Sequence, residues 1–142
     1  MLAKRWGVIP IACGMLCAAG CATLADVRAG QGTGSIRTYN APANLVWSKA
    51  LQACGALGLR IASTEGERGL ILAETGVTGF SWGENVAVFV KKIDDAHTKV
   101  EVVSKRRLAT NITAYNYEPR VLSKLDELLS STSQSQASPS NP

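Results

Sequence analysis

Histidine occurs only once in this chain, at His97, and three of the four cysteines lie within the first 21 residues. Metal sites and nucleophilic catalysis need several convergent side chains, such as a second ligand or an oriented base. His97 stands close to Asp94 and Asp95, and these residues are typical of a solvent-exposed turn between two strands. The sequence therefore predicts no metal site, no catalytic residue and no cofactor, and it does not indicate an enzyme.

The N-terminal residues have the layout of an export signal. Lys4 and Arg5 precede an apolar run, and Ala18-Ala19-Gly20 then presents three small side chains directly before Cys21. The charged start stays on the cytoplasmic side while the apolar run enters the bilayer, and cleavage follows small side chains. The sequence predicts a signal peptide over residues 1–20.

The residues around Cys21 resemble the lipobox of bacterial lipoproteins, except that Ala18 stands where that family usually has leucine. The resemblance implies a diacylglycerol thioether on Cys21, acylation of its new amino group by a fatty acid such as palmitate, and a domain that faces the periplasm. Because Ala22 rather than aspartate follows, it also implies the outer membrane. Two alternatives stay open: a secretory signal cut within 18–22, and an uncleaved anchor over 6–24.

Removal of the signal changes both the cysteine content and the charge. Cys13 and Cys17 leave with the signal and Cys21 becomes a thioether, so Cys54 is the only remaining thiol and no intramolecular disulfide can form. The whole chain carries 15 basic and 11 acidic side chains, and 13 basic ones remain after cleavage. An exported chain with so balanced a charge is not expected to bind nucleic acid.

Composition divides the mature chain into three parts. Residues 21–34 contain the lipidated cysteine and then several glycines without apolar periodicity, which predicts a flexible tether. Residues 130–142 are almost entirely Ser, Thr, Gln, Asn and Pro, which predicts a disordered tail. Residues 35–129 are long enough for one domain with a modest core.

Hydrophobic periodicity predicts the order β-α-β-β-β-β-α in this domain. Strands are expected over 36–39, 59–63, 70–74, 85–93 and 98–106, and helices over 45–57 and 117–130. Asn40 is expected to cap the first helix, with Pro42 in its first turn and Gly58 after its end. Trp47 and Cys54 fall on its apolar face, where Cys54 fills the core. Both helices can cover one face of an antiparallel sheet, so the predicted fold class is α+β.

Alternating valines predict the pairing of the last two strands. If Val90 faces Val100, then Val88 faces Val102, whereas a slip of one residue places Val90 opposite Glu101. The first pairing puts residues 94–96 at the turn.

Several positions together resemble the helix-grip domain of small envelope lipoproteins related to BamC. They are Ala41, Pro42, Val46 and Trp47 at the first helix, the Gly69-Leu70-Ile71 strand entry, and the late Val-x-Val strand before the final helix. The resemblance covers about residues 36–129 and implies an accessory module that binds an envelope protein, but it carries over no functional residues. The alternative is a helix-grip domain that binds or hydrolyses a small ligand, which a cavity lined by convergent polar groups would favour.

Two further sets of residues are candidate contact surfaces. Phe80 and Trp82 lie among glycines in a long connection between strands, where they either bind the partner or fold back onto the core. A basic strip is predicted on the last two strands, for contact with anionic lipid head groups or lipopolysaccharide; the alternative is a solvated face. Its residues are Lys91, Lys92, Lys99, Lys105, Arg106 and Arg107.

Overall fold

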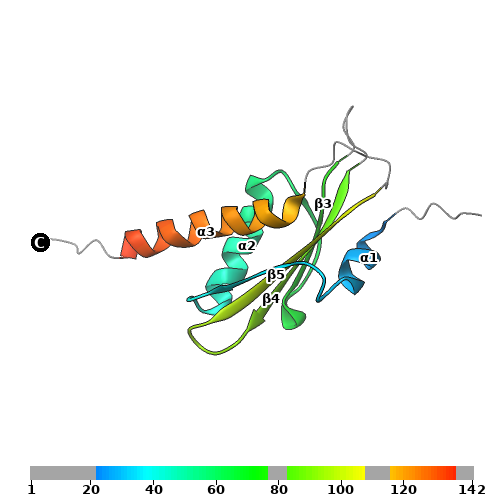
Figure 1. Cartoon of the computed structure of the whole chain (residues 1–142). Helices are drawn as coiled ribbons and strands as arrows, with labels where there is room; N and C mark the ends of the chain where they lie inside the picture. Colours follow the sequence, from blue (N-terminus) through cyan, green and yellow to red (C-terminus); the bar gives the residue numbers. More distant parts are fainter. Residues whose placement is uncertain (1–21, 77–82, 108–115, 137–142) are drawn as a thin grey trace, which may run out of the picture.

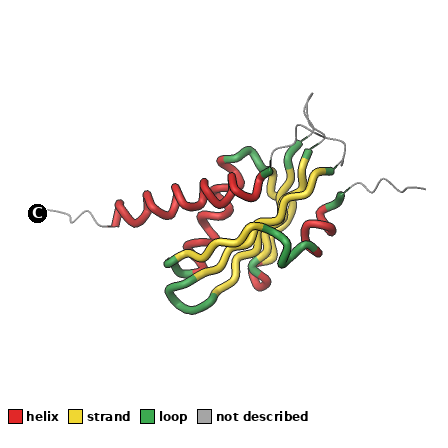
Figure 2. The backbone as a smooth tube through the Cα atoms, in the orientation of Figure 1, coloured by secondary structure: helices red, strands yellow, loops and turns green. Residues whose placement is uncertain are grey.

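The computed structural model describes residues 22–76, 83–107 and 116–136. These residues form a five-stranded antiparallel sheet in the order β1-β5-β4-β3-β2, with helices on both faces (Figures 1 and 2). The strands are β1 (Ser35–Tyr39), β2 (Arg60–Glu65), β3 (Leu70–Glu74), β4 (Glu84–Lys92) and β5 (Thr98–Arg106). The helices are α1 (Leu24–Ala29), α2 (Ala43–Ala56) and α3 (Tyr117–Gln136), with the 3-10 turn η1 (Gly66–Arg68). The predicted α+β class and the predicted order from β1 to α3 are confirmed.

The predicted register of the longest strand pair is also confirmed. Val90 faces Val100 and Val88 faces Val102 across β4 and β5. The turn between these strands closes where the Ile93 amide donates to the His97 carbonyl at 3.0 Å. This hairpin lies within the sheet, because β1 pairs with β5 and β3 pairs with β4.

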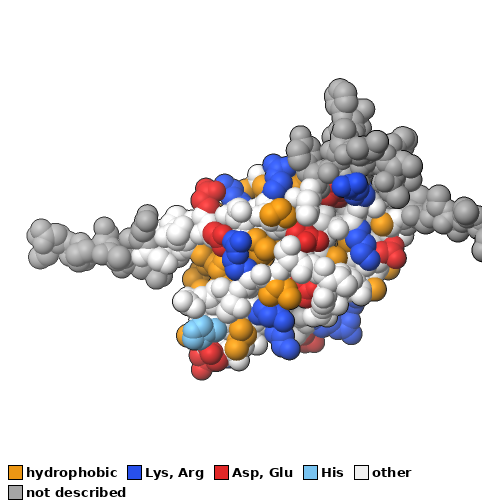
Figure 3. Space-filling view, viewed as in Figure 1, with side chains coloured by type: hydrophobic (Ala, Val, Ile, Leu, Met, Phe, Trp, Pro, Cys, Tyr) orange, Lys and Arg blue, Asp and Glu red, His pale blue; other side chains and the backbone are white. Residues whose placement is uncertain are grey.

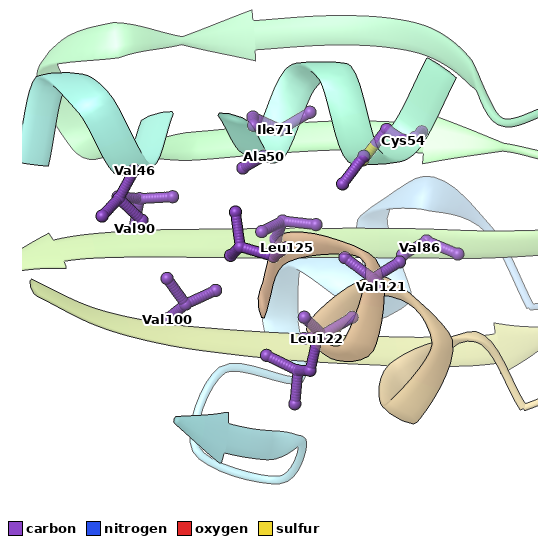
Figure 4. Close-up of a cluster of buried hydrophobic side chains, with 14 of the residues drawn as sticks. Val46, Ala50, Cys54, Ile71, Val86, Val90, Val100, Val121, Leu122 and Leu125 are labelled. Carbon is purple, nitrogen blue, oxygen red and sulfur yellow. The ribbon is translucent and has the colours of Figure 1, made fainter. Parts of the chain in front are cut away.

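The main core lies between the sheet and the two helices α2 and α3 (Figure 4). Val46, Ala50 and Cys54 project from α2, and Leu125 projects from α3, all with no exposed surface. They pack on inward-facing side chains of β3, β4 and β5, among them Ile71, Val86, Val88, Val90, Val100 and Val102. The position of Cys54 as core filler is confirmed because its side chain has no exposed surface, and this burial raises the pKa of the thiol to about 11.

The ends of α2 differ partly from the prediction. The helix begins after Pro42, whose extended backbone (φ −66°, ψ 149°) places it at the N-cap position. The predicted cap at Asn40 is therefore wrong by two residues, and the predicted place of Pro42 in the first turn is wrong by one residue. Gly58 follows the helix in the left-handed conformation at φ 73°, as predicted. Trp47 packs against the core while remaining partly exposed.

The predicted flexible tether over residues 21–34 is wrong for residues 22–34, because this segment contains α1 and packs on the outer face of the sheet. The Asp26 carboxylate accepts hydrogen bonds from the Thr23 amide (2.5 Å) and hydroxyl (2.7 Å), which stabilises the start of α1. Val27 is fully buried against a second apolar cluster of Leu70, Leu72, Ala87, Phe89 and Val103. The segment that follows α1 is held by the Glu101 carboxylate, which accepts hydrogen bonds from two glycine amides.

Helix α3 is longer than predicted. It continues from Tyr117 through Gln136, so the predicted disorder of residues 130–136 is wrong, while residues 137–142 lie outside the described chain. Its last turns extend beyond the sheet (Figure 1). There the hydroxyls of Ser131 and Thr132 donate to the Leu128 carbonyl, so part of the polar surface is satisfied within the helix.

Among the described helices, none is long and apolar enough to cross a membrane.

Candidate functional site

A network of polar side chains joins the ends of β3, β4 and β5 to Ala22. Glu74, which is 8% exposed, forms ion pairs with Arg60 and Arg107. Arg107 also donates through Nε to Asn85 Oδ1 at 3.3 Å, and Asn85 Nδ2 donates to the Ala22 carbonyl at 2.8 Å. The Ala22 amide donates in turn to the Arg107 carbonyl at 3.1 Å. Ala22 is therefore hydrogen-bonded to two different strand ends.

Two further carboxylates extend this network toward α3. Glu84 is buried, and its burial raises the pKa of its carboxyl above the usual range, although the Ser104 hydroxyl donates to it at 2.8 Å. Glu118, in the first turn of α3, accepts hydrogen bonds from the Ser104 amide at 3.1 Å and from the Ser35 hydroxyl at 2.7 Å. These contacts fix the start of α3 against β1 and β5.

The network has a structural role, because its polar groups bind one another. Within the described residues, every buried side-chain nitrogen and oxygen has a hydrogen-bond partner. The same residues contain no group of three or more His, Cys, Asp or Glu side chains placed to hold a metal ion. Glu74 is thus paired with two arginines, while Glu84 and Glu118 accept hydrogen bonds from hydroxyls and an amide of the domain itself, and the network holds the strand ends together.

The predicted basic strip is not continuous. Lys91 does face Lys99 across the hairpin, as expected. Side chains alternate along a strand, so Lys91, Lys99 and Lys105 lie on the α1 side of the sheet while Lys92 and Arg106 lie on the α2 side. On the α1 side, the buried residues Glu101 and Val103 separate Lys99 from Lys105. The basic residues are therefore divided between both faces and both ends of the sheet.

Two of these basic side chains are already paired within the domain. Arg107 is bound to Glu74, and Lys92 lies 2.5 Å from Asp95. Lys105 and Arg106 are exposed at the same end of the sheet as Ala22. Figure 3 shows basic and acidic side chains interspersed over the visible face.

A surface groove lies at the other end of the sheet, where η1 meets the start of α2. It consists of two adjoining hollows of about 430 Å³ and 280 Å³. Both are lined by Ala43, Gly66, Gly69 and Val90. Trp47 adds an aromatic wall and Asn44 a polar side chain to the smaller hollow. The larger hollow is lined by three cationic side chains, Arg68, Lys91 and Lys92, and by the carboxylate of Glu67. The groove thus combines an apolar wall with a charged rim that is mostly basic.

The single histidine belongs to the hairpin turn. The Asp94 carboxylate accepts hydrogen bonds from the Ala96 amide at 2.8 Å and the His97 amide at 2.7 Å, and it lies 2.8 Å from His97 Nδ1. These contacts, with the Ala96 amide contributing most, hold the pKa of Asp94 below its usual range. The interpretation of these residues as an exposed turn is confirmed.

Three predicted site residues fall outside the described chain. Cys21 lies in residues 1–21, and Phe80 and Trp82 lie in residues 77–82. Lipidation at the first and partner contact at the other two remain predictions from the sequence.

No family model matches the chain, and no curated protein matches its sequence. Among solved structures, the chain is similar to the di-domain ARO/CYC BexL from the BE-7585A biosynthetic pathway, with 13% sequence identity and a TM-score of 0.43. The similarity covers 71% of this chain and 42% of the BexL chain, so this protein spans less than half the length of that structure. A likeness this distant carries no argument about activity.

Proposed function

We propose that the protein is a lipoprotein of the bacterial cell envelope, anchored in the outer membrane through Cys21. The observation that carries this proposal is the junction between residues 21 and 22. Before it, charged, apolar and small residues follow one another in the order of an export signal that ends at a cysteine. After it, Ala22 is already hydrogen-bonded into the folded domain, which then faces the periplasm.

The domain serves as an accessory module that binds another envelope protein. A core filled by Val46, Ala50, Leu125 and their neighbours supports this role over the binding of a small ligand between helices and sheet (Figure 4). The surface groove beside Trp47 supports it as well, because an aromatic wall with a mostly basic rim suits an extended protein segment.

Replacement of Cys21 by serine tests the anchor. In a bacterial host that processes lipoproteins, the intact protein should fractionate with membranes, and its mass should equal the chain from Cys21 plus diacylglycerol and one acyl group. Cys21→Ser should abolish both the modification and the membrane association, because no other cysteine follows a run of small residues. Cys17→Ser is the matched control and should leave both unchanged. An unmodified N-terminus, or a Cys21→Ser protein that stays in membranes, contradicts the lipoprotein proposal.

A photoreactive amino acid at Asn44 tests the accessory role. Asn44 is exposed and lines the groove, so a probe there should form a covalent adduct with an envelope protein in living cells. The same probe at Ser123, exposed on α3, is the matched control and should form none. The adduct is detected by its increased mass on denaturing gels, and its partner is identified by mass spectrometry. Equal adducts at both positions, or none at Asn44, would refute the groove as the contact site.

A further inference from the structure

We infer that the end of the sheet at Ala22 lies against the head groups of the membrane in which Cys21 is anchored, with Lys105 and Arg106 facing lipid phosphates. This inference rests on the proposed lipidation of Cys21. It assigns an orientation to the domain and names the anionic bilayer surface as the partner of two residues.

The anchored residue is followed directly by the folded domain, without a flexible linker. Cys21 is joined to Ala22 by one peptide bond, and consecutive Cα atoms are about 3.8 Å apart. Ala22 is held by hydrogen bonds to Arg107 and Asn85, and α1 is held by the buried Val27. A flexible tether of a dozen residues would let the domain move by about 20 Å. With residues 22–34 packed on the sheet, the lipid anchor instead fixes which part of the domain is next to the bilayer.

The part of the domain next to Cys21 is one end of the central hairpin. Arg107 follows the last residue of β5, and Asn85 is the second residue of β4, so Ala22 marks one end of the central hairpin. The turn of this hairpin lies at the opposite end of the sheet (Figure 1). Nine-residue strands rise about 3.3 Å per residue, so the two ends are separated by about 25 Å.

The Ala22 end of the sheet carries two exposed basic side chains, Lys105 and Arg106. Arg60 is exposed there too, but it is paired with the buried Glu74. The exposed carboxylate near this end is Asp26, whose pKa is held below its usual range by hydrogen bonds from Thr23 and by the charge of Lys105. Among the described residues, the unpaired outward charge at this end is therefore positive. Anionic head groups attract such a surface when the distance between them is no more than about 10 Å, close to the screening length at physiological salt.

The hairpin end differs in both distance and charge. It carries Lys91, Lys92 and Lys99, and its turn contains the exposed carboxylates Asp94 and Asp95, of which Asp95 is paired with Lys92. At about 25 Å from the anchor, these lysines also lie beyond the screening length at physiological salt. Five of the six basic residues therefore divide into a membrane-facing pair, Lys105 and Arg106, and a set of three lysines that faces away from the membrane. The sixth, Arg107, lies at the Ala22 end and is bound to Glu74.

Fluorophores at matched positions test this orientation. The full-length lipidated protein is reconstituted into vesicles of phosphatidylethanolamine and phosphatidylglycerol that contain a quencher on the head group. The label is attached to Lys105→Cys or to Lys91→Cys, which are matched lysines on the same face of the same hairpin, with the native Cys54 buried. We expect near-complete loss of emission at position 105 and little change at position 91. Arg106→Cys and Lys92→Cys form a second matched pair on the other face.

The possible results distinguish the orientation of the domain from the lipid anchor. Equal quenching at both members of a pair, or stronger quenching at position 91 or 92, overturns the orientation while flotation of the protein with vesicles still supports lipidation. A protein without lipid mass that does not float overturns the lipid anchor, and the orientation with it. In vesicles of phosphatidylcholine alone, the difference between positions 105 and 91 should shrink. A difference of unchanged size overturns the assignment of Lys105 and Arg106 as phosphate contacts.

Discussion

Leu125→Ala is expected to lower the free energy of unfolding by about 2–5 kcal/mol. Leu125 has no exposed surface and packs from α3 onto the sheet beside Val121 and Leu122 (Figure 4). Its truncation removes apolar contacts and leaves a cavity between two layers that surrounding side chains fill only in part. A domain of this size has a total stability of about 5–15 kcal/mol, so the variant should lose a large part of it.

Chemical denaturation monitored by circular dichroism measures this loss. Ile93→Ala is the matched control, since it removes a side chain of the same size from the hairpin turn, where Ile93 is 56% exposed. The control should change the free energy of unfolding by less than about 0.5 kcal/mol. Similar losses for the two variants would mean that α3 does not pack on the sheet as described.

Local alternation explains why the sheet could be predicted so closely. A strand has a side-chain period of two, so a slip of one residue would move the valines of β5 to the face opposite those of β4. The short turn over residues 94–96 then favours the register with Val90 opposite Val100. The helix ends were less predictable, because Asn40 and Pro42 both suit a helix start and only backbone geometry places the N-cap at Pro42.

Helix α1 shows where composition misleads. Residues 22–34 are rich in glycine, and a six-residue helix with the single buried side chain Val27 is too short to show apolar periodicity. A usable signal was nevertheless present in Thr23 and Asp26, whose spacing is that of a capping box. The extension of α3 was hidden for a related reason, since serine and threonine count as polar loop residues although their hydroxyls can bond within a helix.

Some parts of the candidate site could be predicted from the sequence and others could not. Lipidation at Cys21 can be predicted because the signal is a contiguous motif. The polar network cannot, because Glu74 and Arg107 are 33 residues apart and meet only through the pairing of three strands. Its one sequence signal is the placement of Glu74 at the end of the otherwise apolar β3 and of Asn85 directly before the apolar run of β4. The groove is equally nonlocal, since η1, the start of α2 and the end of β4 form it together.

Gly69→Ala is expected to destabilise the domain by about 3 kcal/mol. Gly69 ends η1 in the left-handed conformation (φ 61°, ψ 37°), which costs a residue with a Cβ about 1–2 kcal/mol. A Cβ there would also stand 2.0 Å from the Val90 carbonyl oxygen, which is backbone and cannot rotate away. Strand β4 would have to shift, and the hydrogen bond from the Val90 amide to the Gly69 carbonyl, 2.7 Å long, would be lost.

Gly55→Ala provides the opposite expectation in the same domain. Gly55 lies within α2, and a Cβ at this position would meet no atom within 4 Å. Alanine lowers the conformational entropy of the unfolded chain and favours helix, so this variant should raise the free energy of unfolding by about 0.5–1 kcal/mol. Urea denaturation of both variants should therefore move the midpoint in opposite directions. If Gly69→Ala were as stable as the parent protein, the close approach of η1 to β4, and with it the floor of the groove, would be wrong.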